Sequence, residues 1–550
     1  MRPDLTPITI HTIPFQDQQP GTSGLRKKTA VFMQQNYLEN FVQSTFDVLY
    51  MDFPDQFQDH TLVVGGDGRF FNSVAIQTIV KMAVANEFGR VMVAKDGILS
   101  TPAASAVIRE NNALGGFILS ASHNPGGADG DFGIKFNPSS GGPAPQEMTE
   151  KIFARTKDIT TYLTVEFPDI DLSQMGTFKA KNTEVVVFDP LTTYTSLMEK
   201  IFDFDAIRAL FSGVFRFNFD AMNAVTGPYA KHIFEDILKA PVGTVLHGTP
   251  LEDFGGLHPD PNLKYAAELV QRMYAPNAPD FGAASDGDGD RNLILGRGLF
   301  VTPGDSLAIL VANATRYIPG YRNGLAGVAR SMPTSMAVDL VAERLQIPHY
   351  ETPTGWKFFV TLMDAGKCTI CGEESFGTGS DHVREKDGIW AVLAWLTILA
   401  KSGKSVEDIV LQHWSQYGRN YFQRHDYEEL NSAKAQKMIS HLRGQLSGLK
   451  KQPFAGRSVI KADDFCYEDP VTNTVTKNQG IRIILDNGSR VICRLSGTGT
   501  SGATLRIYHD VYNKKYDANL EEVLKPYQTA MLQLLKLKEF CGVDKPTVIT

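Results

Sequence analysis

Short apolar runs alternate with helix-length segments in the first part of the chain. Residues 62–64, 91–94 and 116–119 are apolar runs of the kind typical of buried strands. Residues 72–87, between the first two runs, have the apolar spacing of a helix. This order of strand, helix and strand predicts βαβ units in a mixed, largely parallel sheet, whose strand-end loops carry the chemistry.

The same patterns predict elements farther along the chain. Strands are indicated over 184–188, 490–495 and 503–508. Residues 520–540 have the spacing of a terminal helix. The apolar segment 389–400 also predicts a helix, but it is well short of the ~20 residues that span a bilayer. We therefore expect no membrane insertion.

A loop after the third apolar run combines a hydroxyl, an imidazole, a Gly-rich turn and a lysine. It reads SASHNPGGADGDFGIKFN over residues 120–137. A serine hydroxyl becomes a useful nucleophile only when a neighbouring base or cation activates it, and His123 and Lys135 are the local groups available to Ser122. Ser-His-Asn-Pro taken alone favours an ordinary surface loop, because such a short motif also occurs by chance.

A second loop, over 285–291, places three carboxylates at alternate positions with glycines between them: Asp286, Asp288 and Asp290. In an extended or turning backbone these side chains project to one side and converge on a hard cation. An EF-hand is excluded, because Arg291 and Arg297 occupy the positions that require Gly and Glu. Mg²⁺ fits better, since it needs few protein carboxylates and commonly takes a phosphate oxygen as a ligand.

A third loop, over 493–502, follows a predicted strand and is rich in hydroxyl and glycine residues. Such a loop, together with forked guanidinium groups, suits a phosphate monoester. The residues concerned are Arg494, Ser496, Gly497, Thr498 and Arg506. The loop also matches the dinucleotide motif GxGxxG, but that motif needs a helix, whereas 503–508 has strand periodicity.

Composition restricts the class of protein. A chain of 550 residues with 43% hydrophobic and 21% charged residues is expected to form three to five globular domains. A net charge of −7 argues against nucleic-acid or anionic-membrane binding. Five cysteines and an N-terminus without an apolar signal region indicate a reducing compartment, and we expect the cytosol.

Seven stretches together carry a resemblance to a known family: 20–28, 65–69, 120–137, 285–291, 352–357, 372–377 and 493–502. By their content, order and spacing, the chain resembles the phosphoglucomutases of the α-D-phosphohexomutase superfamily, in the eukaryotic-type glucose-specific branch. The resemblance implies an α/β fold of four domains around a central cleft. Three are similar mixed α/β sheet domains and the last is a C-terminal α+β domain.

The predicted domains divide the chain into four ranges by the location of the motifs. They are a phosphoserine-loop domain (1–188), a metal-binding domain (189–301), a sugar-recognition domain (302–418) and a C-terminal phosphate-binding domain (419–550). Internal repetition among the first three is implied by the resemblance and is not visible in the residues.

The resemblance also assigns roles to residues of this chain. Ser122 is expected to carry a phosphoryl group and, with Asp286, Asp288 and Asp290, to bind one Mg²⁺. Arg26 and Arg291 would offset the phosphoryl charge, and proton transfer falls to His123, Lys135 or Lys386, in no order. Thr354 and Gly355 are expected to distinguish the two sugar orientations. Glu373 and Ser375 are expected to bind the sugar hydroxyls. The phosphate-binding loop is expected to comprise Arg494, Ser496, Gly497, Thr498 and Arg506.

The activity implied is reversible interconversion of glucose 1-phosphate and glucose 6-phosphate through a phosphoserine and a glucose 1,6-bisphosphate intermediate. A hexose phosphate is the expected partner, and the chain is expected to be a monomer or weak dimer. Two alternatives are a phosphomannomutase-like enzyme and a noncatalytic or dual-role scaffold. The stretch 331–335 favours the glucose-specific branch, although Met336 stands where that branch usually has a small residue.

Overall fold

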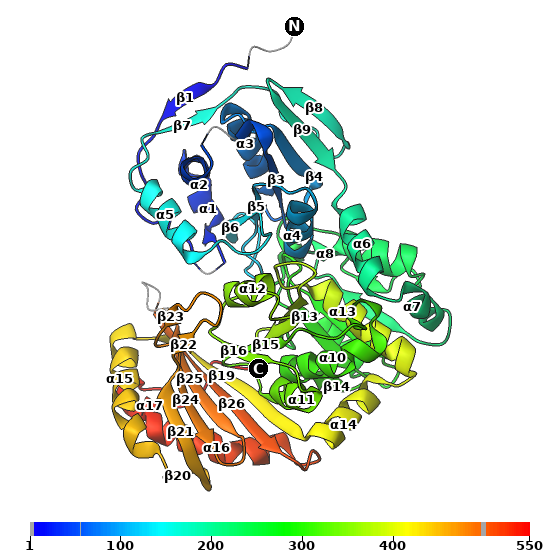
Figure 1. Cartoon of the computed structure of the whole chain (residues 1–550), viewed down its shortest axis with the longest axis vertical. Coiled ribbons are helices and arrows are strands. Elements are labelled where there is room, and N and C mark those ends of the chain that lie inside the picture. Colours follow the sequence, from blue (N-terminus) through cyan, green and yellow to red (C-terminus); the bar gives the residue numbers. More distant parts are fainter. Residues whose placement is uncertain (1–4, 22, 55–56, 497–501) are drawn as a thin grey trace.

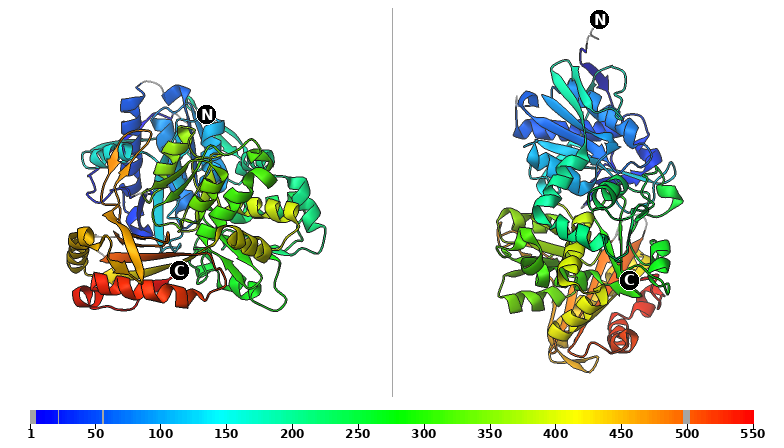
Figure 2. Two further views of the ribbon diagram at one scale, coloured as in Figure 1. Left: turned by 60° about the horizontal axis from the view of Figure 1, so that its bottom comes forward. Right: turned by 90° about the vertical axis from the view of Figure 1, so that its right-hand side faces the viewer.

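The computed structural model describes residues 5–21, 23–54, 57–496 and 502–550. Its four large sheets follow one another along the chain, and we call each sheet with its helices a unit. Figure 1 shows the first unit at the top, the C-terminal unit at the bottom and the other two beside and between them, and Figure 2 shows the same order from two other directions. The mixed α/β architecture agrees with the predicted fold class.

The first unit has a seven-stranded sheet in the order β2-β6-β5-β3-β4-β9-β8 and a separate β1-β7 pair. Its elements are β1 (Ile8–His11), β2 (Leu25–Lys28), α1 (Thr29–Phe32), α2 (Tyr37–Asp52), β3 (Thr61–Gly66), α3 (Asn72–Ala85), β4 (Arg90–Ile98), α4 (Thr101–Glu110), β5 (Gly115–Leu119), β6 (Asp131–Pro138), α5 (Gln146–Thr156), β7 (Thr161–Thr164), β8 (Gly176–Ala180) and β9 (Thr183–Phe188). The predicted βαβ arrangement is present as β3, α3 and β4.

The second and third units have sheets of five and four strands. The second contains α6 (Pro190–Ile201), α7 (Phe204–Phe211), β10 (Phe217–Asp220), α8 (Thr226–Ala230), β11 (Val245–Leu246), α9 (Ala267–Met273), β12 (Phe281–Ser285), β13 (Asn292–Gly296) and β14 (Leu299–Val301). The third contains α10 (Pro303–Tyr317), β15 (Val328–Ser331), α11 (Ala337–Leu345), β16 (His349–Thr352), α12 (Lys357–Asp364), β17 (Ile370–Glu373), β18 (Gly377–Ser380), α13 (Gly388–Ser402) and α14 (Val406–Tyr417).

These three units repeat one strand pattern. The stretches β4-β3-β5-β6, β11-β10-β12-β13 and β16-β15-β17-β18 each place a central strand between two parallel neighbours, followed by an antiparallel strand. The internal repetition implied by the resemblance is therefore a repetition of topology. In each unit, an equivalent loop therefore connects the last parallel strand to the antiparallel strand, at the same end of the sheet.

The C-terminal unit is built on a seven-stranded sheet in the order β20-β21-β24-β25-β26-β19-β27. Its elements are β19 (Arg419–Leu430), α15 (Ser432–Leu449), β20 (Pro453–Phe454), β21 (Arg457–Asp464), β22 (Tyr467–Glu468), β23 (Val475–Thr476), β24 (Ile481–Leu485), β25 (Arg490–Ser496), β26 (Ala503–Asn513), α16 (Leu520–Leu535), α17 (Leu537–Cys541) and β27 (Val548–Ile549). The single helix predicted over 520–540 is wrong, because Lys536 adopts a left-handed φ of 51° and separates α16 from α17.

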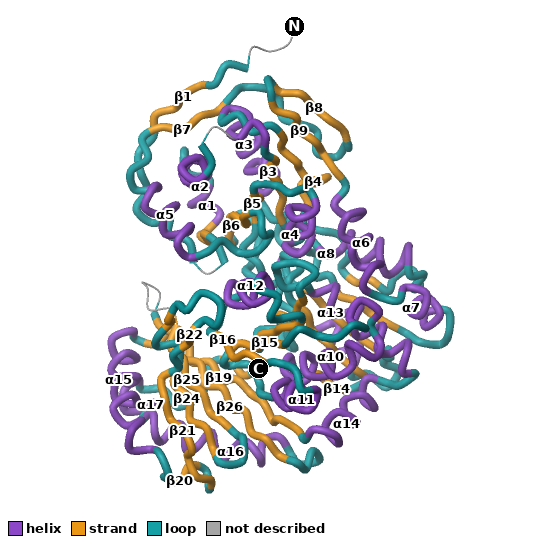
Figure 3. The backbone as a smooth tube through the Cα atoms, in the orientation of Figure 1, coloured by secondary structure: helices purple, strands orange, loops and turns teal. Residues whose placement is uncertain are grey.

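The core is continuous across the first three units. One cluster of buried apolar residues contains members of all three, including Trp390 and Trp395 of α13, whereas the C-terminal unit has a core of its own. No single helix among the described ranges is long and apolar enough to cross a bilayer. The pair α13 and α14 passes that test of length and composition only together, and is bent by 87°. Figure 3 shows loops converging where the units meet.

Candidate active site

A cleft of about 1180 Å³ is lined by residues from all four units. It brings together twelve of the predicted site residues: Arg26, His123, Lys135, Asp290, Arg291, Thr354, Gly355, Glu373, Ser375, Lys386, Arg494 and Arg506. Ser122, Asp286 and Asp288 are buried beside this lining and contact it through His123, Arg291 and Lys135. Residues hundreds of positions apart in the sequence therefore face one space.

The repeated topology explains this convergence. Ser122 lies between β5 and β6, the three aspartates lie between β12 and β13, and Ser375 lies between β17 and β18. Each of these loops joins the same two strands of its unit, the last parallel strand and the antiparallel strand beside it. Because the first three units are packed together, their equivalent loops meet at the cleft.

The Ser122 backbone is held in an uncommon conformation. Its φ is 52°, a left-handed value that non-glycine residues adopt only when the surroundings impose it. The Ser122 N–H donates to Ser120 Oγ at 2.7 Å, and its carbonyl accepts from Arg69 at 2.8 Å. The Ser122 hydroxyl in turn donates to Asp286 Oδ2 at 2.8 Å. These contacts direct the hydroxyl at the acidic loop of the second unit.

Asp67 and Arg69 support this turn and were not among the residues predicted for the site. Their side chains form a fully buried ion pair of 2.9 Å, and Asp67 also accepts from the Ser120 hydroxyl at 2.6 Å. Burial raises the pKa of Asp67, and Arg69 opposes that effect. Asp67 and Arg69 belong to the sequence motif at 65–69, which was recognised from the sequence. The residue types of that motif do not show that these two side chains support the Ser122 loop.

Replacing Arg69 with methionine is expected to lower kcat by ~10- to 100-fold, because Ser122 loses the guanidinium contact that fixes its carbonyl. Steady-state turnover, with the melting temperature measured in parallel, tests this. Arg155→Met is the matched control, since Arg155 pairs with Asp47 elsewhere in the same unit. Equal turnover of the Arg69 variant and wild type would contradict the role.

The three aspartates form a buried group whose carboxylate oxygens suit a divalent cation. One oxygen from each of Asp286, Asp288 and Asp290 lies within 4.8 Å of the others. Oδ1 of Asp288 and Oδ1 of Asp290 are buried and have no hydrogen-bond partner among the described residues. Three converging carboxyl groups, two of which carry a buried oxygen that is free to accept, fit a hard cation such as Mg²⁺.

The surroundings of Asp286 and Asp288 differ, so their pKa values shift in opposite directions. Burial, Asp290 and Asp288 raise the pKa of Asp286. Burial alone would also raise the pKa of Asp288, but Lys135 and a 2.6 Å hydrogen bond from the Thr101 hydroxyl lower it overall. Thr101 stands at the start of α4 in the first unit and was not predicted. Its contact joins the first unit to the acidic loop.

Four basic residues surround the aspartates. Lys386 Nζ lies 3.0 Å from Asp290 Oδ2, and Lys135 Nζ lies 3.5 Å from Asp288 Oδ2. Burial alone would lower the pKa of both lysines, but Asp290 raises that of Lys386, and Glu385 and Asp288 raise that of Lys135. Both lysines are therefore cationic at neutral pH. The other two basic residues are Arg26 and Arg291.

His123 has the opposite behaviour. Burial, Arg291 and Arg26 lower its pKa well below the ordinary value, so the imidazole is neutral at pH 7. Its Nδ1 lies 3.4 Å from Ser122 Oγ. The site thus holds two cationic ammonium groups and one neutral imidazole.

The predicted sugar contacts come from the end of β17, from the loop that follows it and from the segment between β16 and α12. Glu373 is buried and accepts from the backbone N–H of Gly355 at 3.2 Å. Burial raises the pKa of Glu373, whereas Lys386 lowers it. The Thr354 hydroxyl is buried and has no partner in the part of the chain that the structure describes, and Ser375 also lines the cleft. A carboxylate and two hydroxyls therefore face the cleft from one unit.

Arginines line the cleft on the C-terminal unit. Arg494 of β25 is paired in register with Arg506 of β26, and Arg506 lies 3.5 Å from Asp426. Arg424, which was not predicted, also lines the cleft. Ser496 ends β25 and donates to Thr504 O at 3.4 Å without lining the cleft. Gly497 and Thr498 lie outside the described residues.

Comparison with known proteins adds sequence evidence along nearly the whole chain. Models of the alpha/beta/alpha domains I, II and III of phosphoglucomutase/phosphomannomutase match residues 17–163, 192–298 and 303–417. A model of the phosphoglucomutase-1 C-terminal domain matches residues 419–547. The chain belongs to the phosphoglucomutase/phosphomannomutase family.

Relatives within this family match end to end. A phosphoglucomutase of Rhizobium radiobacter is 55% identical over 545 residues, covering 98% of this chain and 99% of that protein. A cytoplasmic phosphoglucomutase of Mesembryanthemum crystallinum is 52% identical over 578 residues, with coverages of 98% and 99%. Chloroplastic plant enzymes also match.

A solved family structure has the same architecture. The Paramecium phosphoglucomutase pp63/parafusin, in an open form, is 49% identical, superposes with a TM-score of 0.93, and covers 99% of each chain. The resemblance inferred from the seven motifs is confirmed at the level of family and fold. The chain is thus a family enzyme with all four parts of the architecture.

Proposed function

We propose that the chain interconverts glucose 1-phosphate and glucose 6-phosphate through a phosphoserine at Ser122 and a bound glucose 1,6-bisphosphate. The observation that carries this proposal is that the Ser122 hydroxyl faces the acidic loop of the second unit within one cleft. The same cleft is lined by the sugar-binding loop and by the arginines of the C-terminal unit. One phosphate can then lie at Ser122 while the other lies at Arg494 and Arg506.

Asp286, Asp288 and Asp290, with an oxygen on Ser122, would hold Mg²⁺. The ion supplies electrophilic stabilisation of the charge that spreads over the phosphoryl oxygens in the transition state. Arg291 Nε lies 3.9 Å from Asp286 Oδ2, which places its guanidinium beside the same oxygens. Arg26 lines the adjacent wall, and its charge adds to this stabilisation.

Proton transfer is assigned by charge state. The Ser122 hydroxyl donates to Asp286, and the neutral His123 has its Nδ1 3.4 Å from Ser122 Oγ, so the imidazole is the candidate that carries a proton between this oxygen and the cleft. Lys135 and Lys386 are cationic, so they can donate to a sugar oxygen. Glu385 accepts from Asn137 at 2.8 Å and lies 3.6 Å from Lys135 Nζ, which positions that ammonium group.

Sugar and distal phosphate contacts complete the proposal. Glu373 and Ser375 would bind ring hydroxyls, while Thr354 and Gly355 would distinguish the two sugar orientations. Arg494, Ser496, Gly497, Thr498 and Arg506 would bind the distal phosphate. Among the described residues that line the cleft, Met336 is not included.

A coupled assay with glucose 1-phosphate and mannose 1-phosphate tests the substrate. We expect kcat/KM to be at least ~10-fold higher for glucose 1-phosphate, since misoriented hydroxyls leave buried partners such as Glu373 unsatisfied. A higher value for mannose 1-phosphate would favour the phosphomannomutase alternative. Absence of turnover with both sugars would favour the scaffold alternative, which otherwise leaves the filled catalytic positions unexplained.

Several finer properties are part of the same proposal. We infer a cytosolic protein without nucleic-acid partners, acting as a monomer or weak dimer. Both cytoplasmic and chloroplastic relatives match, so relatives alone do not decide the compartment. The domain boundaries after residues 188, 301 and 418 also stay predictions. The breaks between the four sheets, at β9–β10, β14–β15 and β18–β19, support them.

A further inference from the structure

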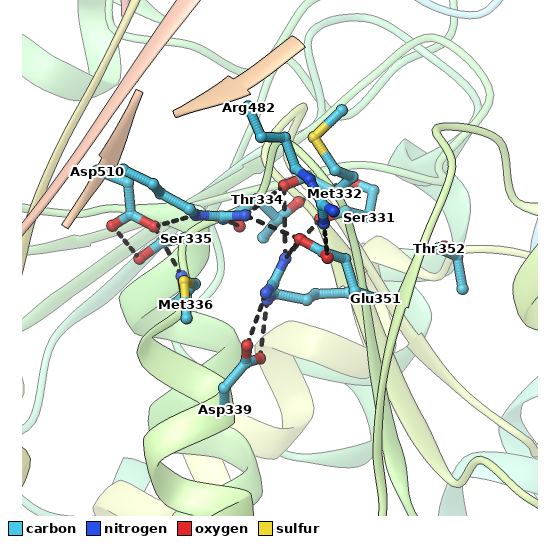
Figure 4. Close-up of polar contacts among 12 residues, drawn as sticks. Ser331, Met332, Thr334, Ser335, Met336, Asp339, Glu351, Thr352, Arg482 and Asp510 are labelled. Atoms are coloured by element: carbon cyan, nitrogen blue, oxygen red, sulfur yellow. Dashed lines mark hydrogen bonds and ion pairs between the residues drawn. The ribbon is translucent and has the colours of Figure 1, made fainter. Parts of the chain in front are cut away.

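The C-terminal unit contacts the third unit through a polar cluster, buried except at Glu351, beside a small apolar one. We call the polar cluster the arginine clasp: Arg330, Glu351, Arg482, Arg490 and Asp510. Arg330 and Glu351 belong to β15 and β16 of the third unit, and the others to β24, β25 and β26 of the C-terminal unit. Figure 4 shows its polar contacts with the segment 331–336.

Glu351 is the shared acceptor of the clasp. Its Oε1 accepts from Arg330 and from Arg490, each at 3.0 Å, and its Oε2 accepts from Arg482. Burial alone would raise the pKa of Glu351, but Arg330, Arg490 and Arg482 lower it to about 2. The carboxylate is therefore ionised at neutral pH, and it joins arginines of two units.

Arg490 reaches from β25 to the backbone of the third unit. It donates to Met332 O at 2.8 Å and to Thr334 O, while its Nε lies 3.0 Å from Asp510 Oδ2. Asp510 in turn accepts from the N–H of Met336 at 2.9 Å. The segment 331–336 is thus held by directional contacts from the C-terminal unit.

That segment holds the sugar-binding loop. The Thr334 hydroxyl accepts from the backbone N–H of Glu374 at 2.8 Å, and the Ser331 hydroxyl donates to Glu374 Oε2 at 3.2 Å. Glu374 stands between Glu373 and Ser375, and it lines the cleft. An unbroken set of contacts therefore leads from Arg490 to the sugar-binding loop.

The other end of the same strands carries the cleft arginines. Arg490 and Arg494 are four residues apart on β25, and Asp510 and Arg506 are four residues apart on β26. These two pairs face each other in register. Because paired strands are stiff over ~13 Å, displacement of the clasp also displaces the arginines.

We propose that Arg490 is a positioning residue, which through the arginine clasp sets the distance between the sugar-binding loop and the arginines Arg494 and Arg506. The inference rests on the proposed function. A sugar phosphate must engage both sites at once, so its affinity depends on their separation, whereas free phosphate engages one site. Buried ion pairs add little net stability compared with apolar packing. The clasp is therefore better explained as a device that positions the two units than as one that stabilises their interface.

The test is calorimetric titration of glucose 6-phosphate and, separately, inorganic phosphate into the full-length chain. Glu351→Gln is the principal variant, because its side chain is 25% exposed and the amide keeps the shape of the carboxylate. Arg490→Met is the second. We expect each to weaken glucose 6-phosphate binding by ~10-fold or more while phosphate binding stays within ~2-fold.

Arg443→Met is the matched control, since Arg443 pairs with Asp464 inside the C-terminal unit. It is expected to bind both ligands as wild type does. Unchanged glucose 6-phosphate affinity in Glu351→Gln and Arg490→Met would overturn the inference, and so would a parallel loss of affinity for both ligands. Turnover of glucose 1-phosphate by the wild-type chain is assayed alongside, so that failure of the positioning role can be told from failure of the proposed function. If the wild-type chain did not turn over glucose 1-phosphate, both proposals would be overturned.

Discussion

Replacing Ser122 with alanine is expected to lower mutase turnover by at least ~1000-fold, because it removes the oxygen that accepts and returns the phosphoryl group. The loss is expected in kcat rather than in the binding of glucose 6-phosphate. Removing one buried hydroxyl leaves the cleft lining intact, since Ser122 lies beside that lining. Turnover is measured in a coupled assay with saturating glucose 1,6-bisphosphate.

Ser173→Ala is the control for this variant, because Ser173 is exposed in the same unit and its hydroxyl contacts Asp171. It is expected to retain wild-type turnover. Added bisphosphate is expected to leave Ser122→Ala inactive, since the intermediate cannot recharge a missing hydroxyl. Turnover within ~10-fold of wild type in Ser122→Ala would exclude the phosphoserine route.

Replacing Asp288 with asparagine is expected to weaken Mg²⁺ binding by at least ~100-fold and to lower turnover at limiting Mg²⁺. The change replaces one of the three carboxyl groups that converge in a buried site. The substitution also changes the side chain that pairs with Lys135 and accepts the hydrogen bond from the Thr101 hydroxyl. Mg²⁺ affinity is measured directly by calorimetry and indirectly from the Mg²⁺ dependence of kcat.

Asp280→Asn is the matched control for the metal site. Asp280 immediately precedes β12, whereas the acidic loop follows the other end of that strand, and Asp280 pairs with Arg297. Its variant is expected to bind Mg²⁺ as wild type does. If Asp288→Asn had the same Mg²⁺ dependence as Asp280→Asn, the assignment of the acidic loop would be wrong.

Much of the local structure could be predicted from the sequence. The runs at 62–64 and 116–119 lie within the buried strands β3 and β5, and the acidic loop forms the compact oxygen cluster that its spacing indicates. These features depend on neighbouring residues, so the local pattern is sufficient. The family likeness added the sugar-binding residues, whose chemistry in isolation is common to many loops.

Other features required tertiary contacts that periodicity does not contain. The charged string 384–387 has the composition of an exposed turn, yet Arg384, Glu385 and Asp387 are buried because each meets a partner from elsewhere in the fold: Asp364, Asn137 and Tyr194. The roles of Asp67 and Arg69 are likewise visible only once β3 lies beside the Ser122 loop. The repeated strand order was also hidden, because topology is repeated while residues are not.

The most direct test of the central claim is transfer of a labelled phosphoryl group. The chain is incubated with Mg²⁺ and radiolabelled glucose 1,6-bisphosphate, digested, and the labelled peptide is sequenced. We predict label on Ser122 that is removed by a chase with unlabelled glucose 6-phosphate at a rate compatible with kcat. Catalytic turnover without label on Ser122, or with label that the chase does not remove, would contradict the account.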